Sequence, residues 1–564
     1  MSQSCPAITS ELNLQITNFC KHIAGSEQVT AIGLIDNCST KTSNVKSTLQ
    51  VILVILDFQP RIINYVKNFN GRNVIFFAVD QWIFERDIER GFLGEALASK
   101  LIFSHSSLCG EEYLLEKEIT LKKRLILEAL ENLSLSYPEL VYQIQIQPQY
   151  FIYEVMLNRV RVFPLLAYEL SNLIKGTKLK NEDEALKSYN EALKQLEVEK
   201  IITFQNGYVT ISKEFVIASQ KPKVWFTNIS KNAPRAIFTS FFGVLPQLVN
   251  IVSQNTEAIL KTQKINWRKQ IEPVSYFVDP EKYVFMPTSE GLVSLAERVD
   301  IKTFARKMLS NEEGTTITVK PIGGMLNDIY LINGYVKGKE KKVLVKRFKD
   351  WSGFKWFPLT LWSHGARVFA VSAKARLAKE IAASEFLRCR GFNVPKILQV
   401  SNAARLVFME YIEGEDLSQG IKRIALATGE EENQKDFAEI EKAGEILAQV
   451  HAYNMTLGDT KPENMIITPN DTIYLLDFEQ ATMDGDKAWD IAEFLYYSGH
   501  YLQPLASNVK AETIVQSFIK GYLKAGGNPS DIKKAGESKY TRVFSVFTMP
   551  PVIKLISNIC KKTE

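Results

Sequence analysis

The sequence is poor in residues that build metal clusters and disulfide frameworks. Its 564 residues include only six cysteines and five histidines. The cysteines stand at positions 5, 20, 38, 109, 389 and 560, and no two have the spacing of a zinc or redox pair. The histidines are equally dispersed. This pattern argues against a His/Cys metal site and indicates a reduced intracellular compartment, so we predict a cytoplasmic location.

Long apolar runs are also missing. The most apolar stretch, residues 235–252, is interrupted by Pro246, Gln247 and Asn250. It is shorter than the roughly 20 apolar residues that a membrane-spanning helix needs. The N-terminus lacks the basic start and apolar run of a signal peptide. A net charge of +5 is too small to demand a nucleic-acid or membrane partner. We therefore predict no membrane span, and a buried or interfacial helix over 235–252.

The length of the chain argues for several domains. Residues 29–56 predict a strand, a polar loop and a second strand, and residues 72–80 predict another strand. The predicted segments are an α/β domain over 1–115, a helical segment over 116–180, a helix and hairpin over 181–216, linker and helical material over 217–312, and a block over 313–564 that carries the chemistry.

Residues 181–216 predict a helix followed by a hairpin. Asn206-Gly207 is the strongest hairpin-turn signal, because both turn residues need a positive φ. A helix followed by a hairpin is how a winged helix ends. The helix carries Glu191 and Glu197 as well as lysines, which favours a packing module over DNA binding.

The stretch LGDTKPENMIITPNDTIYLLDFEQA, residues 457–481, predicts two short apolar strands joined by turn residues. Such a hairpin brings Asn464, before the first strand, close to Asp477, after the second. Asp459 precedes Asn464 by five residues. Mg²⁺ prefers hard oxygen ligands, and a nearby carboxylate can accept a proton from an attacking hydroxyl. These residues together indicate a Mg-nucleotide phosphotransfer site.

This pattern resembles the protein-kinase-like superfamily. The catalytic-loop motif D-x-K-x-x-N matches residues 459–464, and the D-F-G position reads Asp477-Phe-Glu. The resemblance implies a bilobal kinase-like fold that uses ATP with Mg²⁺ or Mn²⁺. It also implies that Asp459 is the catalytic base, that Asn464 and Asp477 hold the metal, and that Lys461 steadies the γ-phosphate.

The resemblance assigns upstream residues as well. Gly323 and Gly324 form a turn whose backbone N–H groups would approach phosphates. Lys346 stands in an apolar strand, where a lysine needs a partner. By analogy with the family's lysine–glutamate pair, that partner is Glu380, with Glu385 as the rival.

Three further expectations follow from the resemblance. The string MEYIEG resembles the hinge between the two lobes, so the main chain of Glu410 and Ile412 would hold adenine. Asp490, in the string WDIAEFLYY, would bond the catalytic loop as a structural acid. His451 is expected to pack near that loop and to take no part in catalysis.

The motifs resemble two different branches of the superfamily. The strings GGMLNDIY, MEYIEG and GDTKPENMI resemble the RIO family and the kinase of the KEOPS complex, whereas WDIAEFLYY resembles aminoglycoside and choline phosphotransferases. Leu457 stands where many members have His, and Glu479 replaces the D-F-G glycine, which favours a constitutively formed site. Residues 349–376 insert many aromatic residues, for packing or for docking a partner.

Residues 31–55 resemble nucleotidyltransferases, whose S-D-x-D motif supplies two metal-binding carboxylates. Here that slot reads Ser47-Thr-Leu-Gln50, without an acid, so the resemblance implies an inactive domain. The sequence thus predicts an α+β multidomain protein: an N-terminal α/β nucleotidyltransferase-like domain, helical and winged-helix segments, and a C-terminal bilobal protein-kinase-like fold.

The predicted function is that of an atypical serine/threonine protein kinase with a protein substrate and a regulatory or docking N-terminal half. Two alternatives remain open. One is a small-molecule kinase of the choline or aminoglycoside type, which an acidic pocket for a cationic acceptor would favour. The other is a non-catalytic ATP-binding scaffold, with residues 181–216 on nucleic acid.

Overall fold

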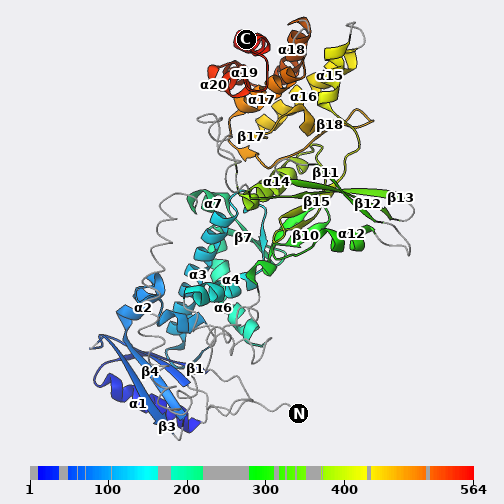
Figure 1. Cartoon of the computed structure of the whole chain (residues 1–564). Coiled ribbons are helices and arrows are strands. Elements are labelled where there is room, and N and C mark those ends of the chain that lie inside the picture. The colour runs from blue at the N-terminus through cyan, green and yellow to red at the C-terminus, as the bar shows by residue number, and fades with distance from the viewer. Residues whose placement is uncertain are drawn as a thin grey trace, which may run out of the picture. The chain divides into compact units, whose positions relative to one another are not determined.

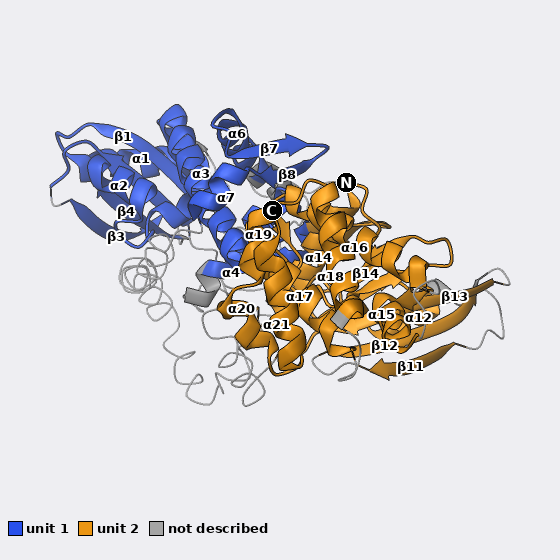
Figure 2. Ribbon diagram, turned by 90° about the horizontal axis from the view of Figure 1, so that it is seen from above, with its two compact units in different colours: residues 1–284 blue, residues 285–564 orange. Residues whose placement is uncertain are grey.

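The computed structural model describes residues 10–36, 49–59, 61–69, 72–102, 105–162, 180–219, 279–309, 317–323, 327–336, 339–350, 370, 372–427, 433–502 and 508–564. The chain forms two compact units, Met1–Val284 and Phe285–Glu564 (Figure 2). No helix in these ranges combines the length and apolar character needed to cross a bilayer. The segments predicted at 235–252 and most of 349–376 lie outside the described residues.

The first body of unit 1 is a five-stranded mixed sheet with the order β3-β4-β2-β1-β5 (Figure 1). The central strand β2 is buried at every position, which explains why every residue of its sequence LQVILVI except Gln50 is apolar. Side chains of α1 pack on one face of the sheet, and side chains of α2 and α3 pack on the other. The elements are α1 (Ser10–Ala24), β1 (Val29–Asp36), β2 (Leu49–Ile55), β3 (Ile62–Phe69), β4 (Arg72–Asp80), α2 (Gln81–Arg90), η1 (Ala98–Ile102) and β5 (Ser106–Cys109).

The slot compared with a two-metal motif falls at the start of β2. Ser47 and Thr48 lie outside the described residues, whereas Leu49 and Gln50 are buried in the strand. Gln50 pairs with Ile75 of the parallel neighbour β4. A buried amide inside a sheet supplies no carboxylate for a metal. The absence of nucleotidyltransferase activity stays a prediction, and the buried position of Gln50 supports it.

The second body of unit 1 begins with a long helix and includes a hairpin. Asn206 and Gly207 have φ of 52° and 82°, which confirms the hairpin turn predicted from Asn-Gly. Helix α3 packs against α6, and the domain boundaries predicted at 115/116 and 180/181 stay predictions. Lys122 Nζ of α3 lies 3.2 Å from Ser188 Oγ of α6. The elements are α3 (Glu111–Ser136), β6 (Gln145–Ile146), α4 (Gln149–Val162), α6 (Lys180–Val198), β7 (Ile202–Gln205), β8 (Tyr208–Ile211), α7 (Lys213–Ser219) and η4 (Pro280–Tyr283).

Unit 2 starts with an antiparallel five-stranded sheet of order β11-β12-β13-β15-β14. Residues before 312 pack on this sheet, and the domain boundary predicted at 312/313 stays a prediction. Phe304 of α12 stacks on Phe408 of β15 at 4.1 Å between ring centroids, and Ser289 donates to the carbonyl of Ile397. The elements are β9 (Val284–Thr288), β10 (Gly291–Ser294), α12 (Ile301–Leu309), β11 (Thr318–Gly323), β12 (Asp328–Val336), β13 (Lys339–Arg347), α14 (Ala373–Arg388), β14 (Ile397–Ser401) and β15 (Leu406–Glu410).

The rest of unit 2 is mainly helical, around one large apolar core. Two small sheets, β16-β18-β19 and β17-β20, lie between the helices along the chain and carry the predicted catalytic loop. A sheet lobe followed by a helical lobe agrees with the predicted bilobal arrangement. The elements are β16 (Glu415–Asp416), α15 (Leu417–Leu426), α16 (Gln434–Ala452), β17 (Met455–Thr456), η6 (Pro462–Asn464), β18 (Met465–Ile467), β19 (Ile473–Leu475), β20 (Thr482–Met483), α17 (Lys487–His500), α18 (Asn508–Lys524), α19 (Pro529–Ala535), α20 (Ser538–Phe544) and α21 (Pro550–Lys562).

Helices α16 and α18 approach each other closely at two glycines. A Cβ on Gly444 would lie 2.2 Å from the carbonyl oxygen of Phe518, and one on Gly521 would lie 1.9 Å from that of Glu441. Gly444→Ala should therefore force the helices apart and lower the free energy of unfolding by about 1–3 kcal/mol. Thermal unfolding of the full chain measures this, with the exposed Gln516→Ala on α18 as control. Equal unfolding temperatures for both variants would contradict the prediction.

Candidate active site

The stretch 457–481 folds back on itself as the sequence predicts. Strand β18 pairs with β19, and the N–H of Leu476 donates to the carbonyl of Asn464 at 2.8 Å. This bond fixes Asn464 beside the end of the second strand. Asp477 follows at once with φ of 59°, a left-handed conformation that Asp tolerates better than most residues. The hairpin therefore brings Asn464 and Asp477 to the same end.

The catalytic loop is held by two buried acids of α17. Asp490, which is fully buried, accepts the N–H groups of Leu457 at 2.7 Å and Gly458 at 2.8 Å. Glu493 accepts the N–H of Thr460 at 2.9 Å. The expected bonding of the loop by Asp490 is thus present, and it fixes the backbone on both sides of Asp459.

His451 contributes to the same support. Its ring nitrogens lie 2.8 Å from the hydroxyl of Tyr522 and 3.2 Å from the carboxylate of Asp490. The ring is buried, and both nitrogens are engaged. This placement agrees with the packing role expected for His451.

Lys346 of β13 lies at the centre of a cluster of carboxylates. Its Nζ is 2.6 Å from Asp477, 3.1 Å from Glu380 of α14 and 3.3 Å from Glu479. Glu385, the rival partner, instead pairs with Arg388 at 2.7 Å. The structure therefore joins Lys346 to Glu380, as the sequence predicted.

Glu380 ties this cluster to the catalytic segment. Its Oε2 also accepts the N–H of Phe478 at 3.0 Å. Burial, opposed by Lys346, raises the pKa of Glu380 to about 7. Burial alone would lower the pKa of Lys346, but the carboxylates of Asp477, Glu380 and Glu479 raise it well above its usual value. The lysine is thus held in its charged form.

Sequence reasoning missed two residues, Asn327 and Arg376, which meet at Glu479. Asn327 Nδ2 donates to Glu479 at 2.6 Å, and Arg376 Nη1 lies 3.2 Å from the same oxygen. Arg376 is fully buried. A glutamate at the glycine position of the D-F-G motif could have signalled a buried cation, because a buried carboxylate needs one.

Asp459 and Lys461 face each other in the loop. The Nζ of Lys461 lies 3.0 Å from Oδ1 of Asp459 and 5.2 Å from the ring centroid of Tyr497. Burial raises the pKa of Asp459, and Lys461 offsets this only in part. Desolvation opposes the charge of Lys461, but Asp459 and Glu493 raise its pKa. Asp459 is therefore a carboxylate with increased proton affinity, and it lies beside the positive charge of Lys461.

The proposed metal ligands supply hard oxygen donors. Nδ2 of Asn464 donates to the carbonyl of Asp459 at 2.9 Å, which leaves the amide oxygen for a cation. Burial would raise the pKa of Asp477, but Lys346 lowers it, so this carboxylate is ionised. Within the described residues, no three His, Cys, Asp or Glu side chains gather as a metal site. Two oxygen ligands completed by water and phosphate suit Mg²⁺.

The remaining predicted residues are placed less completely. Gly323 ends β11 with φ of 133°, and no atom of the described residues lies within 4 Å of the position that a Cβ would take. Gly324 lies outside the described residues. The N–H of Glu410 donates to the carbonyl of Lys396, so its carbonyl is the group left for adenine. Ile412 follows β15 and is largely buried. Adenine binding there stays a prediction.

Replacing Glu479 should show how far the cluster depends on it. Glu479→Gly takes from the buried Arg376 its carboxylate partner, and breaking a buried ion pair costs about 3–5 kcal/mol. We expect a markedly lower unfolding temperature. The double variant Arg376→Met/Glu479→Leu removes both charges and should recover part of the loss. An unfolding temperature for Glu479→Gly equal to that of the parent chain would contradict this account.

No family model matches the chain. A comparison with known proteins shows a partial similarity. The chain is 26% identical over 167 residues to the KEOPS complex subunit Bud32 of Pyrococcus abyssi (strain GE5 / Orsay). The aligned region covers 28% of this chain and 70% of that protein. This distant similarity, beside the geometry above, supports a kinase-like, ATP-binding protein.

Proposed function

We propose that this protein is an ATP-dependent phosphotransferase that uses Mg²⁺ or Mn²⁺, of the atypical serine/threonine protein-kinase type, acting in the cytoplasm. One observation carries the proposal. Buried Lys346 joins Glu380 of one lobe to Asp477 of the other, at 3.1 and 2.6 Å, beside the loop that holds Asp459 and Asn464. Triphosphate binding and phosphoryl transfer both require such an arrangement.

In this proposal the side chains have separate tasks. Asp459 accepts the proton of the acceptor hydroxyl, which its raised pKa favours. Lys346 and Lys461 hold the phosphate oxygens and neutralise their charge. Asn464 and Asp477 would hold the divalent cation, which would supply positive charge that polarises the phosphates. Since Asp490 and Glu493 already fix the loop backbone, little reorganisation remains during the reaction.

The choice of a protein acceptor rests on the weaker support for the small-molecule alternative. That alternative used Glu479 as an acid for a cationic acceptor. Glu479 is only 4% exposed and is engaged by Asn327, Arg376 and Lys346. A carboxylate with these partners does not offer a free charge to an acceptor. The similarity to a subunit of a complex gives further support to protein partners.

Unit 1 then serves as a regulatory or docking half. On α6, Glu191 pairs with Lys194, and Glu199 after the helix pairs with Lys123 of α3. Acids interspersed with the lysines weaken attraction to phosphate backbones, so packing is favoured over nucleic-acid binding. We propose a winged-helix-like fold for the helix and hairpin of residues 181–216.

Two variants separate the steps of the proposed reaction. Asp459→Ala should lower phosphoryl transfer at least about 100-fold and retain ATP binding, since it removes the base alone. Asp477→Ala should also abolish metal-dependent nucleotide binding. Transfer is measured with labelled ATP, with and without cell extract, and binding is measured by calorimetry with and without Mg²⁺.

The exposed Asp484→Asn is a matched acid control and should behave as the parent chain. Label on protein supports the proposal, and label on a small molecule supports the choline or aminoglycoside type. ATP binding without any transfer would support the scaffold. Measurable transfer by Asp477→Ala would overturn the site assignment.

A further inference from the structure

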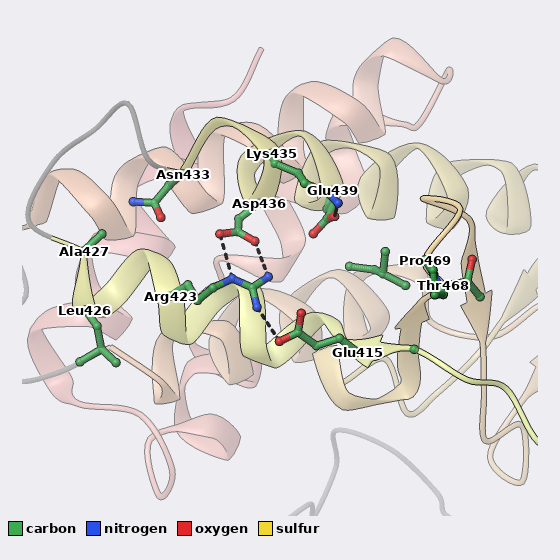
Figure 3. Close-up of a pocket in the computed structure, with 12 residues that line it drawn as sticks. Glu415, Arg423, Leu426, Ala427, Asn433, Lys435, Asp436, Glu439, Thr468 and Pro469 are labelled. Carbon is green, nitrogen blue, oxygen red and sulfur yellow. Dashed lines mark hydrogen bonds and ion pairs between the residues drawn. The ribbon is translucent and has the colours of Figure 1, made fainter.

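A pocket of about 730 Å³ opens in unit 2, and none of its lining residues is among those assigned to phosphotransfer (Figure 3). It is lined by α15, the first turns of α16, and the end of β18 with the turn that follows. Gly414 closes one side tightly, because a Cβ there would lie 2.3 Å from the carbonyl oxygen of Ile467. The volume is in the range of sites that bind a small ligand or a few side chains.

The charged side chains of the pocket are mostly paired. Arg423 lies between two carboxylates, at 2.6 Å from Asp436 and 2.5 Å from Glu415, as Figure 3 shows. Lys435 lies 2.8 Å from Asp471, which follows the pocket's turn. Each of the two lining cations therefore already has a close carboxylate partner.

Glu439 is the exception among these groups. It is only 5% exposed, yet its Oε2 has no hydrogen-bond partner among the described residues. The nearest cation is Lys435, whose Nζ lies 3.8 Å from the other carboxylate oxygen. Burial and the neighbouring Asp436 raise the pKa of Glu439. Glu439 lines the pocket, and a carboxylate that lacks a close donor favours a positively charged partner.

Apolar groups also line this pocket. Leu426, at the end of α15, is 66% exposed, and Ile467 is another apolar lining residue. An ammonium or guanidinium group on an aliphatic stem matches both features, because the stem covers apolar surface while the head meets the acid.

We propose that this pocket binds an aliphatic cation, an ammonium or guanidinium group on an alkyl stem, with Glu439 as its main partner. Two sources carry this chemistry: a lysine or arginine side chain of a polypeptide, and a free polyamine. The pocket and the proposed metal ligand Asn464 lie at opposite ends of the three-residue strand β18. Binding here requires neither ATP nor phosphotransfer, so it can be tested separately from the proposed function.

The test uses the full chain and fluorescence anisotropy without nucleotide. The probes are a fluorescein-labelled heptapeptide with two lysines among leucines, its norleucine counterpart, and spermidine as unlabelled competitor. We expect the lysine peptide to bind at least ten-fold more tightly than the norleucine peptide. Glu439→Gln, which keeps the shape and removes the charge, should weaken the lysine peptide about ten-fold.

Two further variants keep the test independent of folding. Leu426→Lys changes an exposed side chain and should weaken the lysine peptide by placing a like charge beside the pocket. Glu445→Gln, on the same helix but paired with Lys524, should leave binding unchanged. Thermal unfolding checks that each variant is folded.

The competitor distinguishes the two sources. Displacement of the peptide by micromolar spermidine supports the site with a free polyamine as ligand, and failure to displace it supports a polypeptide side chain. The proposal is overturned by equal binding of the two peptides, by unchanged binding to Glu439→Gln and Leu426→Lys, or by no binding of either the lysine peptide or spermidine.

Discussion

The buried positive charge of Lys346 is the constraint around which unit 2 is organised. An ammonium group removed from water must be paired, and here three carboxylates supply the pairing, one from α14 and two from the stretch 477–479. One of them, Glu380, also bonds the backbone of Phe478, so helix α14 and the catalytic segment share a single ionic centre. The same cluster that stabilises the two lobes thus presets the geometry for a triphosphate.

A second set of buried acids stabilises the catalytic loop by accepting hydrogen bonds from its backbone N–H groups. Asp490 and Glu493 accept hydrogen bonds from the N–H groups of residues 457, 458 and 460. These groups need such acceptors because a loop lacks the regular backbone hydrogen bonds of a helix or sheet. Glu479 also stabilises this region, because its carboxylate accepts hydrogen bonds from the side chains of Arg376 and Asn327. A glycine at 479 could not make these contacts, which agrees with a constitutively formed site.

The two proposals use carboxylates that differ in the distance to their nearest cation. In the proposed active site Asp459 has Lys461 at 3.0 Å, whereas the cation nearest to Glu439 is Lys435 at 3.8 Å. Each of the two carboxylates keeps a buried oxygen without a hydrogen-bond donor among the described residues. Burial makes such an oxygen informative, since an exposed oxygen would be satisfied by water. Strand β18 links the regions, with Asn464 before it and Ile467 at its end.

The sequence alone determined the local elements: the hairpin after Asn464, the Asn206-Gly207 turn, the buried strands, and the types of residue in the catalytic loop. These follow from turn chemistry and periodicity within a few residues. It could also place Lys346 with a glutamate, by resemblance. Only the tertiary structure chose Glu380 over Glu385, placed the start of unit 2 at Phe285, and brought Arg376 and Asn327 to Glu479. Glu380 lies 34 positions from Lys346, and Arg376 and Asn327 lie 103 and 152 positions from Glu479. Packing in three dimensions decides such pairings, because no local pattern records which buried charges will meet.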